Sequence, residues 1–205
     1  GAAVTFVGRV GSDDAGATLR ASLEASGVDT SHLAVDAGAP SGIALIGVNA
    51  DGDNAIVVSP GANAHVSSSD LDGASAVLAD AAVVLLQLEI PAETVTNAAL
   101  AAGGTVVLNP APAPSTPGAL PVALMDRVDV LVPNFIELAQ LTGSEPSDDV
   151  DDLTVAARGL GVETVVVTRG ADGALVVTID EAIEVGTGRE RAAGPGDDGH
   201  ADVGI

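Results

Sequence analysis

The chain contains no cysteine, tryptophan or tyrosine, and no lysine occurs among its 205 residues. Without cysteine there can be no disulfide, no thiolate catalysis and no cysteine-based metal site. The missing lysine excludes a Walker P-loop, a phosphate-binding lysine of the protein-kinase type and a pyridoxal Schiff base. Any phosphate chemistry must therefore use arginine, a metal ion or backbone N–H groups.

Aromatic side chains are also scarce, because only two phenylalanines occur although 47% of the residues are hydrophobic. The core must therefore be built from Ala, Val, Leu and Ile. No apolar run reaches the ~18 residues that a membrane span needs, and no basic-then-apolar signal segment opens the chain. A chain of 205 residues favours one domain with a sizeable core. We expect a soluble cytoplasmic protein without a membrane partner.

Positive charge is the scarcest property, with seven arginines against 29 acidic residues and a net charge of −22. Such a surface argues against nucleic acid as a partner. The acids are dispersed through a periodic apolar sequence, which argues against a disordered acidic tail. At ~1 M salt the Debye length is about 3 Å, so repulsion between surface acids is screened. The composition is typical of a halophile's cytoplasmic protein.

Strand and helix patterns alternate along most of the chain. β-branched runs predict strands, and apolar residues spaced three or four apart predict helices. Repeated strand–helix units imply an α/β fold with a mostly parallel sheet covered by helices, which binds ligands beyond the carboxyl ends of its strands. We expect Leu19 and Leu23 to face inward. The predicted strands are 3–7, 83–88, 105–108, 129–132 and 164–168, and the predicted helices include 14–26, 69–79, 134–143 and 150–160.

Two alternating segments, 41–48 and 55–59, flank the sequence Asn49-Ala50-Asp51-Gly52 and predict a β-hairpin. Asp51 and Asp53 would suit calcium, but the spaced ligands of an EF-hand loop are not there. A polar turn is the favoured interpretation.

The stretch 129–143, DVLVPNFIELAQLTG, holds the clearest local motif. Pro133 ends the strand, Asn134 lies at the N-cap of the next helix, and Glu137 completes a capping box. An ordinary capped helix would explain this pair by itself. A strand that leads onto a helix N-terminus also presents free N–H groups and a positive dipole end, which suit anions and above all phosphate.

Two other strand ends carry candidate residues. Glu89 follows the strand at 83–88, where it is either a solvated loop acid or a ligand-binding group. The segment Thr168-Arg169-Gly170-Ala171-Asp172-Gly173 follows the strand at 164–168. Its simplest interpretation is a hairpin turn that leads to residues 174–177.

Four segments in their order and spacing closely resemble the ribokinase/PfkB family of sugar kinases. They are LLQLEIPAETV (85–95), VVLNPAPA (106–113), DVLVPNFIELAQLTG (129–143) and VVVTRGADGALVV (165–177). The resemblance implies one ribokinase-like domain over residues 1–185, an α/β sandwich with a Rossmann-like sheet and a small β lid at about 40–60. Residues 186–205 diverge from the family pattern, and we expect a poorly ordered tail there.

The resemblance further implies a carbohydrate kinase, which transfers phosphate from ATP to a sugar hydroxyl. In the family, Asn134 and Glu137 would help to place the ATP phosphates and Mg²⁺, and Glu89 would bind sugar hydroxyls. A monovalent cation such as K⁺ is a further candidate. The Gln-Leu-Glu and Asn-Pro-Ala-Pro-Ala segments favour D-ribose, which would become ribose 5-phosphate. The loop that would hold ATP comprises Thr168, Arg169, Gly170, Ala171, Asp172 and Gly173.

The family's catalytic base is the last residue of an Asp-Thr-x-Gly-Ala-Gly-Asp segment. The nearest match here is 191–197, which keeps both glycines and the final Asp. The resemblance therefore implies Asp197 as the base that accepts the proton of the sugar hydroxyl. The family's Gly-Gly sugar signature and first strand would precede Gly1, so we expect a chain truncated at both ends.

Two alternatives to ribose phosphorylation remain open. One is another substrate of the family, such as 2-keto-3-deoxygluconate or a nucleoside. The other is a catalytically incompetent fragment that at most binds nucleotide. For a kinase of this family, the resemblance implies a small-molecule sugar as the substrate, and a homodimer formed through the lid is a candidate assembly.

The net charge of −22 predicts a fold that depends on salt. Removing salt lengthens the Debye length from about 3 Å at 1 M to about 30 Å at 0.01 M, so the acidic groups repel one another over longer distances. Circular dichroism during dialysis from molar KCl into dilute buffer should show a loss of structure. A cooperative thermal transition that persists unchanged in dilute buffer would contradict this prediction.

Overall fold

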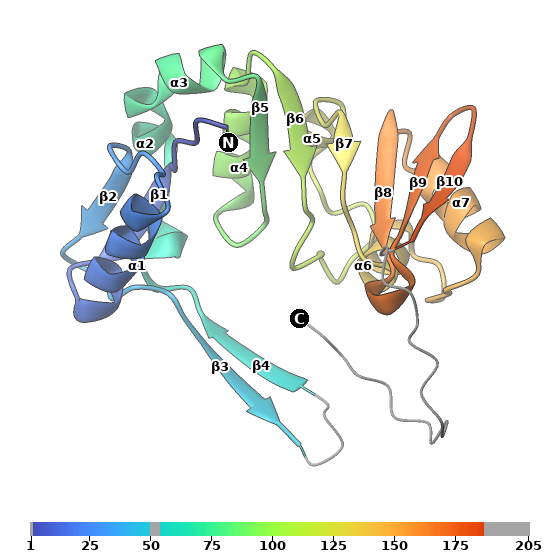
Figure 1. Ribbon diagram of the computed structural model, residues 1–205, viewed down its shortest axis with the longest axis horizontal. Coiled ribbons are helices and arrows are strands. Elements are labelled where there is room, and N and C mark those ends of the chain that lie inside the picture. The colour runs from blue at the N-terminus through green and yellow to red at the C-terminus, as the bar shows by residue number, and fades with distance from the viewer. Residues whose placement is uncertain (1, 50–53, 187–205) are drawn as a thin grey trace. The chain divides into compact units, whose positions relative to one another are not determined.

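The computed structural model describes residues 2–49 and 54–186. The chain divides into two compact units, whose elements are labelled in Figure 1. The first comprises Gly1–Val107 and Leu120–Val128, and the second comprises Leu108–Ala119 and Asp129–Ile205. Asp197 and the predicted tail beyond Gly186 lie outside the described residues, as do positions 50–53 of the predicted hairpin turn.

The first unit alternates strands and helices. β1 pairs in parallel with β2, and the helix α1 connects them. The strands β5 and β6 are hydrogen-bonded neighbours joined through α4, and both arrows point the same way in Figure 1. The elements in chain order are β1 (Gly8–Gly11), α1 (Asp14–Ala25), β2 (Leu33–Asp36), β3 (Ile43–Val48), β4 (Asn54–Ser59), η1 (Gly61–His65), α2 (Ser68–Gly73), α3 (Ser75–Asp80), β5 (Val83–Leu86), α4 (Ala92–Ala101), β6 (Thr105–Leu108) and α5 (Val122–Met125).

The second unit places four neighbouring strands in the order β7, β8, β9, β10. β7 and β8 run parallel, whereas β9 is antiparallel to both β8 and β10. The predicted strand 105–108 and the predicted strand 164–168 are confirmed at both ends. The elements of the second unit are β7 (Val130–Leu131), α6 (Phe135–Thr142), α7 (Val150–Gly159), β8 (Thr164–Thr168), η2 (Gly170–Asp172), β9 (Ala174–Thr178) and β10 (Ala182–Val185).

The core of each unit consists of aliphatic side chains, as the scarcity of aromatics predicts. Val95, Val106 and Leu124 are fully buried in the first unit, and Leu131 and Leu175 are fully buried in the second. The expected contribution of isoleucine is wrong, because the buried apolar side chains of the described residues are Val, Leu and Ala. Isoleucines instead lie exposed on the hairpin, on α6 and near β10, namely Ile43, Ile46, Ile56, Ile136, Ile179 and Ile183.

Three local predictions in the first unit need correction. The strand expected at 3–7 begins at Gly8, because Thr5 forms only an isolated bridge with Asp29 before the ladder of β1 and β2. Leu19 is exposed rather than inward, and Gly16 is the buried residue of α1. The single helix expected over 69–79 is two helices, α2 and α3, of which the first begins at Ser68 and is capped by Ser67.

The hairpin of β3 and β4 has both faces exposed. Leu45 pairs with Val57 on one face, and Ile46 pairs with Ile56 on the other. Each of these four side chains is more than half exposed. In Figure 1 the two strands project away from β1, β2 and α1 of the same unit. The predicted hairpin is therefore confirmed, but as an arm that buries neither face.

No helix in the described ranges is both long enough and apolar enough to cross a lipid bilayer.

Candidate functional site

The parallel pairing of β7 with β8 brings the two predicted phosphate-binding motifs together. Val130 pairs with Thr164, and Leu131 pairs with Val165. Beyond the ladder, the Thr168 N–H donates to the Pro133 carbonyl at 2.9 Å, and Asn134 forms an isolated parallel bridge with Thr168. The start of α6 and the exit of β8 are therefore neighbours at one edge of the sheet, where parallel strands place their binding loops.

The capping box predicted for α6 is confirmed in both directions. The Glu137 N–H donates to Asn134 Oδ1 at 2.8 Å, and the Asn134 N–H donates to Glu137 Oε2 at 2.8 Å. The backbone N–H groups of Phe135 and Ile136 donate to no acceptor in the described ranges. The helix ends at Gly143, whose φ of 75° lies in the left-handed region. The N-terminus of α6 therefore presents two free donors at its positive end.

The loop after β8 is a tight turn closed by its own backbone. The Arg169 N–H donates to the Gly173 carbonyl at 2.8 Å, and the Gly173 N–H donates to the Gly170 carbonyl at 3.2 Å. Within the described part of the chain, the N–H groups of Gly170 and Ala171 have no acceptor. The turn leads directly into β9, so the hairpin interpretation is confirmed and the two free donors remain at its tip.

The two glycines of this loop have different physical roles. Both have a positive φ, 56° at Gly170 and 88° at Gly173. A Cβ at Gly170 would meet no atom within 4 Å, so a ligand has room to approach the backbone there. A Cβ at Gly173 would collide with the backbone carbonyl of Val185. The lack of a side chain at Gly173 therefore makes room for the Val185 carbonyl at the end of β10, and its implied role at the nucleotide stays a prediction.

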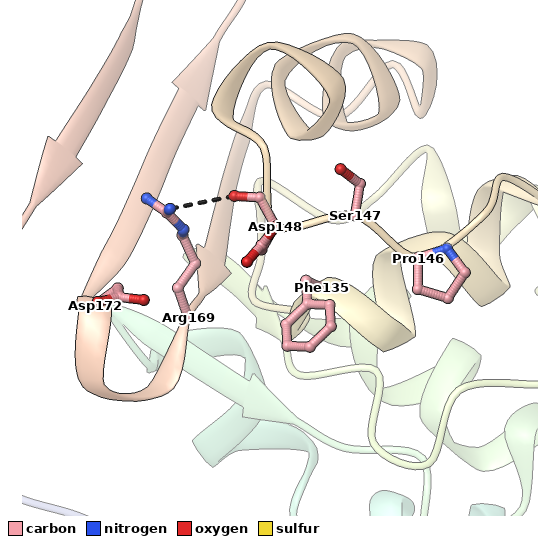
Figure 2. Close-up of a pocket in the computed structure, with 6 residues that line it drawn as sticks. All are labelled: Phe135, Pro146, Ser147, Asp148, Arg169 and Asp172. Carbon is pink, nitrogen blue, oxygen red and sulfur yellow. Dashed lines mark hydrogen bonds between the residues drawn. The ribbon is translucent and has the colours of Figure 1, made fainter. Parts of the chain in front are cut away.

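The direction of the Arg169 side chain is decided by the structure. Its Nη1 donates to Glu184 Oε2 at 2.7 Å, and its Nη2 donates to the Asp148 carbonyl at 3.2 Å, the bond drawn in Figure 2. Nε is buried without a hydrogen-bond partner among the described residues. The guanidinium thus joins the loop to β10 and to the segment before α7. Two of its three nitrogens already donate hydrogen bonds within the protein.

A shallow pocket of about 250 Å³ lies between this loop and the start of α6. Figure 2 shows the Phe135 ring, the Asp172 carboxylate and the Arg169 side chain around it, and residues 146–148 run above Phe135 in this view. The lining residues are Phe135, Pro146, Ser147, Asp148, Arg169 and Asp172. Sequence reasoning missed Phe135 and residues 146–148 as pocket residues. Tertiary contacts decide which side chains line a pocket, and such contacts leave no periodic signal in the sequence.

The remaining predicted site residues, Glu89 and Asp197, are not among the residues that line this pocket. Glu89 is exposed, lies beyond the end of β5 and belongs to the first unit. Asp197 lies outside the described residues. The site that the structure brings together therefore comprises the start of α6 and the loop after β8, both in the second unit.

Comparison with known proteins identifies the family of the chain. Residues 1–193 match the model of the family described as pfkB family carbohydrate kinase. A ribokinase of Haemophilus influenzae is 36% identical over 181 residues, which cover 86% of this chain and 58% of the relative. A deoxyribokinase of Salmonella typhi is 35% identical over 207 residues, which cover 98% of this chain and 66% of the relative. The chain thus spans less than two thirds of the length of these relatives.

A solved structure shows the same fold. Ribokinase of Arabidopsis thaliana, complexed with ribose and ATP, superposes with a TM-score of 0.74 at 31% identity. The alignment covers 90% of this chain and 61% of that protein. The predicted α/β class, with a mostly parallel sheet and covering helices, is therefore confirmed.

Proposed function

Because the chain belongs to the pfkB family of carbohydrate kinases, we propose that it phosphorylates a sugar hydroxyl with ATP, and that D-ribose is converted to ribose 5-phosphate. The observation that carries the proposal is the bridge between Asn134 and Thr168, which sets two donor-bearing loops side by side. Within the described ranges, the two segments carry four backbone N–H groups without acceptors, those of Phe135, Ile136, Gly170 and Ala171. Such groups bind phosphate without lysine.

The nucleotide would lie against the start of α6 and the loop after β8. Thr168 is exposed at the exit of β8, so its hydroxyl is available to a phosphate oxygen. Gly170 leaves open space beside the backbone. Ala171 would contribute through its N–H group, and Arg169 and Asp172 would flank the nucleotide as lining of the pocket. Gly173 and Arg169 chiefly hold the loop in shape through β10.

Magnesium fits this arrangement through the nucleotide. In the described part of the chain, no three acidic or histidine side chains gather as a metal site. Mg²⁺ is commonly held by one or two carboxylates together with substrate phosphates and water. Glu137 is half-buried and uses Oε2 for the cap, so its carboxylate would reach Mg²⁺ indirectly through water. When bound, the ion would neutralise charge on the transferred phosphoryl group. We include K⁺ as a further candidate activator.

In the proposed mechanism, Glu89 binds the sugar and Asp197 acts as the catalytic base. Glu89 is an exposed carboxylate beyond β5, where it can accept hydrogen bonds from sugar hydroxyls. Asp197 would accept the proton of the attacking hydroxyl. The Salmonella deoxyribokinase, with 98% coverage of this chain, makes deoxyribose a second candidate sugar. 2-Keto-3-deoxygluconate and nucleosides complete the set to be tested, and a fragment that only binds nucleotide is the alternative without catalysis.

A panel of sugars assayed in molar KCl with Mg²⁺ and ATP tests the function. Ribose turnover with a kcat/KM at least about tenfold above every other sugar is expected, which is 1.4 kcal/mol of discrimination. Asp197→Asn should abolish turnover and leave ATP affinity unchanged, because the base acts only on the hydroxyl. Preferred turnover of another sugar would replace ribose as substrate. ATP binding without any turnover would establish the nucleotide-binding fragment and overturn the kinase proposal.

Nucleotide affinity tests the two loops separately from turnover. We expect Gly170→Val to weaken ATP binding at least about tenfold, which is 1.4 kcal/mol, because the side chain fills the open space at the donors. Asn134→Ala should weaken it too, at a cost of about 1 kcal/mol of helix stability. Calorimetric titration of ATP measures both effects.

Gly161→Val is the matched control for Gly170→Val. Gly161 also has a positive φ, 71°, and a Cβ there would meet no atom within 4 Å, but it precedes β8 rather than following it. Backbone strain is therefore common to the two variants. Equal ATP affinity in both would remove the loop after β8 from the nucleotide site.

We propose that one face of the β3–β4 hairpin covers the bound sugar. The other face would contact a second copy of the chain and form a dimer. Leu45 and Val57 carry one exposed face, and Ile46 and Ile56 carry the other. Leu45→Asp and Ile46→Asp each place a charge on one face of the hairpin. The variant whose face forms the dimer contact should sediment as a monomer, and the other should remain a dimer. Val155→Asp alters an exposed valine on α7 and serves as control. A parent protein that sediments as a monomer would contradict the proposed dimer.

The cytoplasm of a salt-accumulating organism is the proposed location, because a net charge of −22 suits an interior that holds molar salt.

A further inference from the structure

The base of the β3–β4 hairpin is held by one carboxylate. Asp13, the N-cap of α1, accepts the Gly16 N–H at 2.8 Å on Oδ1. The same carboxylate accepts the Ser41 N–H at 2.8 Å on Oδ2 and the Ser41 hydroxyl at 2.6 Å on Oδ1. Ser41 lies two residues before β3 and is 2% exposed. One side chain therefore joins the first turn of α1 to the start of the hairpin.

Ser41 extends this connection to β1. Its Oγ accepts the Gly11 N–H at 2.9 Å, so the hydroxyl donates to Asp13 and accepts from the last residue of β1. A Cβ at Gly11 would collide with the backbone of Pro40 and Ser41, and a Cβ at Gly16 would collide with the Gly11 carbonyl. The backbones of β1, α1 and residue 41 therefore meet without room for side chains between them.

The end of the hairpin is tied to its start. The Ala62 N–H donates to the Pro40 carbonyl at 2.8 Å. Gly61 has a φ of 51°, and a Cβ there would collide with the Pro40 carbonyl. At Gly42 a Cβ would lie 2.9 Å from the Pro60 carbonyl. Movement at the start of β3 must therefore also move the end of β4.

A second tether lies farther along the chain. His65 Nδ1 is 2.8 Å from Asp36 Oδ2, which joins η1 to the end of β2. The His65 side chain is half-exposed and lies at the far end of η1, six positions after the last residue of β4, Ser59. This pair holds η1, whereas the Asp13 carboxylate bonds directly to the residue that leads into β3.

We propose that Asp13 is a positioning residue for the sugar site, which sets the angle of the β3–β4 hairpin by holding Ser41 against β1 and α1. The hairpin buries neither of its faces, so contacts along its length do not fix its direction. The contacts at the base of the hairpin must therefore fix its direction. The proposal rests on the proposed function, in which the hairpin covers the bound sugar.

The charge of Asp13 supports this geometry. The Ser41 hydroxyl first, and then the N–H groups of Ser41 and Gly16, hold the pKa of Asp13 at about 2. Because the folded pKa is lowered, the stabilisation from this carboxylate is present above its unfolded pKa and is lost as the pH falls toward 2. The carboxylate therefore stays ionised at neutral pH and accepts every one of these bonds.

Asp13→Asn is the first test variant, because it keeps the shape of the side chain. The amide has one acceptor oxygen, and its NH₂ group would face an N–H donor. Asp14→Asn is the matched control, since it removes the same charge one residue along, at an exposed side chain. Ser41→Ala is the second variant, which removes the hydroxyl and leaves the Ser41 N–H bond to Asp13, so it serves if Asp13→Asn does not fold.

Two measurements on the full chain distinguish a residue that only stabilises the hairpin from one that also positions the sugar site. Hydrogen exchange of the Ser41 amide and of the β3 and β4 amides should accelerate at least about tenfold in Asp13→Asn relative to Asp14→Asn, with α4 and β6 unchanged. In the same variant the KM for ribose should rise about tenfold, while the KM for ATP and kcat should change less than about twofold. Ser41→Ala should show smaller changes in the same direction.

Equal exchange and equal ribose KM in all three variants would overturn the proposal. Faster hairpin exchange with an unchanged ribose KM would also overturn it, since Asp13 would then stabilise the hairpin without positioning the sugar site. A parent protein that turns over no sugar would refute the proposed function instead. In that case the exchange comparison still decides whether Asp13 holds the hairpin.

Discussion

The parallel pairing of β7 with β8 is the constraint on which the candidate site depends. Parallel strands end at the same edge of a sheet, so the segments that follow them start as neighbours. Here the hydrogen bond from Thr168 to Pro133 extends the pairing past the end of β7 and brings Asn134 beside Thr168. A site made from these two segments needs no side chain to reach across, because the backbone itself delivers the donors.

Under the proposed function, a chain without lysine would bind phosphate through these backbone donors. The capping box satisfies the donors of Asn134 and Glu137, whereas those of Phe135 and Ile136 find no acceptor among the residues that the structure describes. Arg169, the one cation in the loop after β8, points to Glu184 and to the Asp148 carbonyl. Its charge thus holds the loop in shape, and under the proposed function the N–H groups and the helix dipole would bind the phosphate.

The hairpin shows a different balance between local and distant contacts. Its strands satisfy each other's backbone groups but bury neither face, so an isolated arm of this kind has little stability of its own. The network of Asp13, Ser41 and Gly11 supplies a rigid base. These unburied faces are the ones that we propose to contact a sugar and a second copy of the chain.

Sequence alone determined the elements whose signals are local. Asn134, Glu137 and Gly143 mark both ends of α6 because each acts on the turn in which it sits. The bounds of β6 and β8 followed from short β-branched runs, and the core followed from the lack of aromatics, except that its isoleucines lie at the surface. The four quoted segments indicated the family, which the match over residues 1–193 confirms.

Tertiary structure decided what depends on residues far apart in the chain. The direction of Arg169 follows from Glu184 on a later strand, and the need for glycine at position 173 follows from the Val185 carbonyl. The bond between Asp13 and Ser41 joins positions whose spacing matches no helix or strand period. Periodicity records which face of an element is apolar, but not which distant atom fills the space beside it. For that reason the sequence indicated the loops of this site, and only the fold decided what each side chain in them contacts.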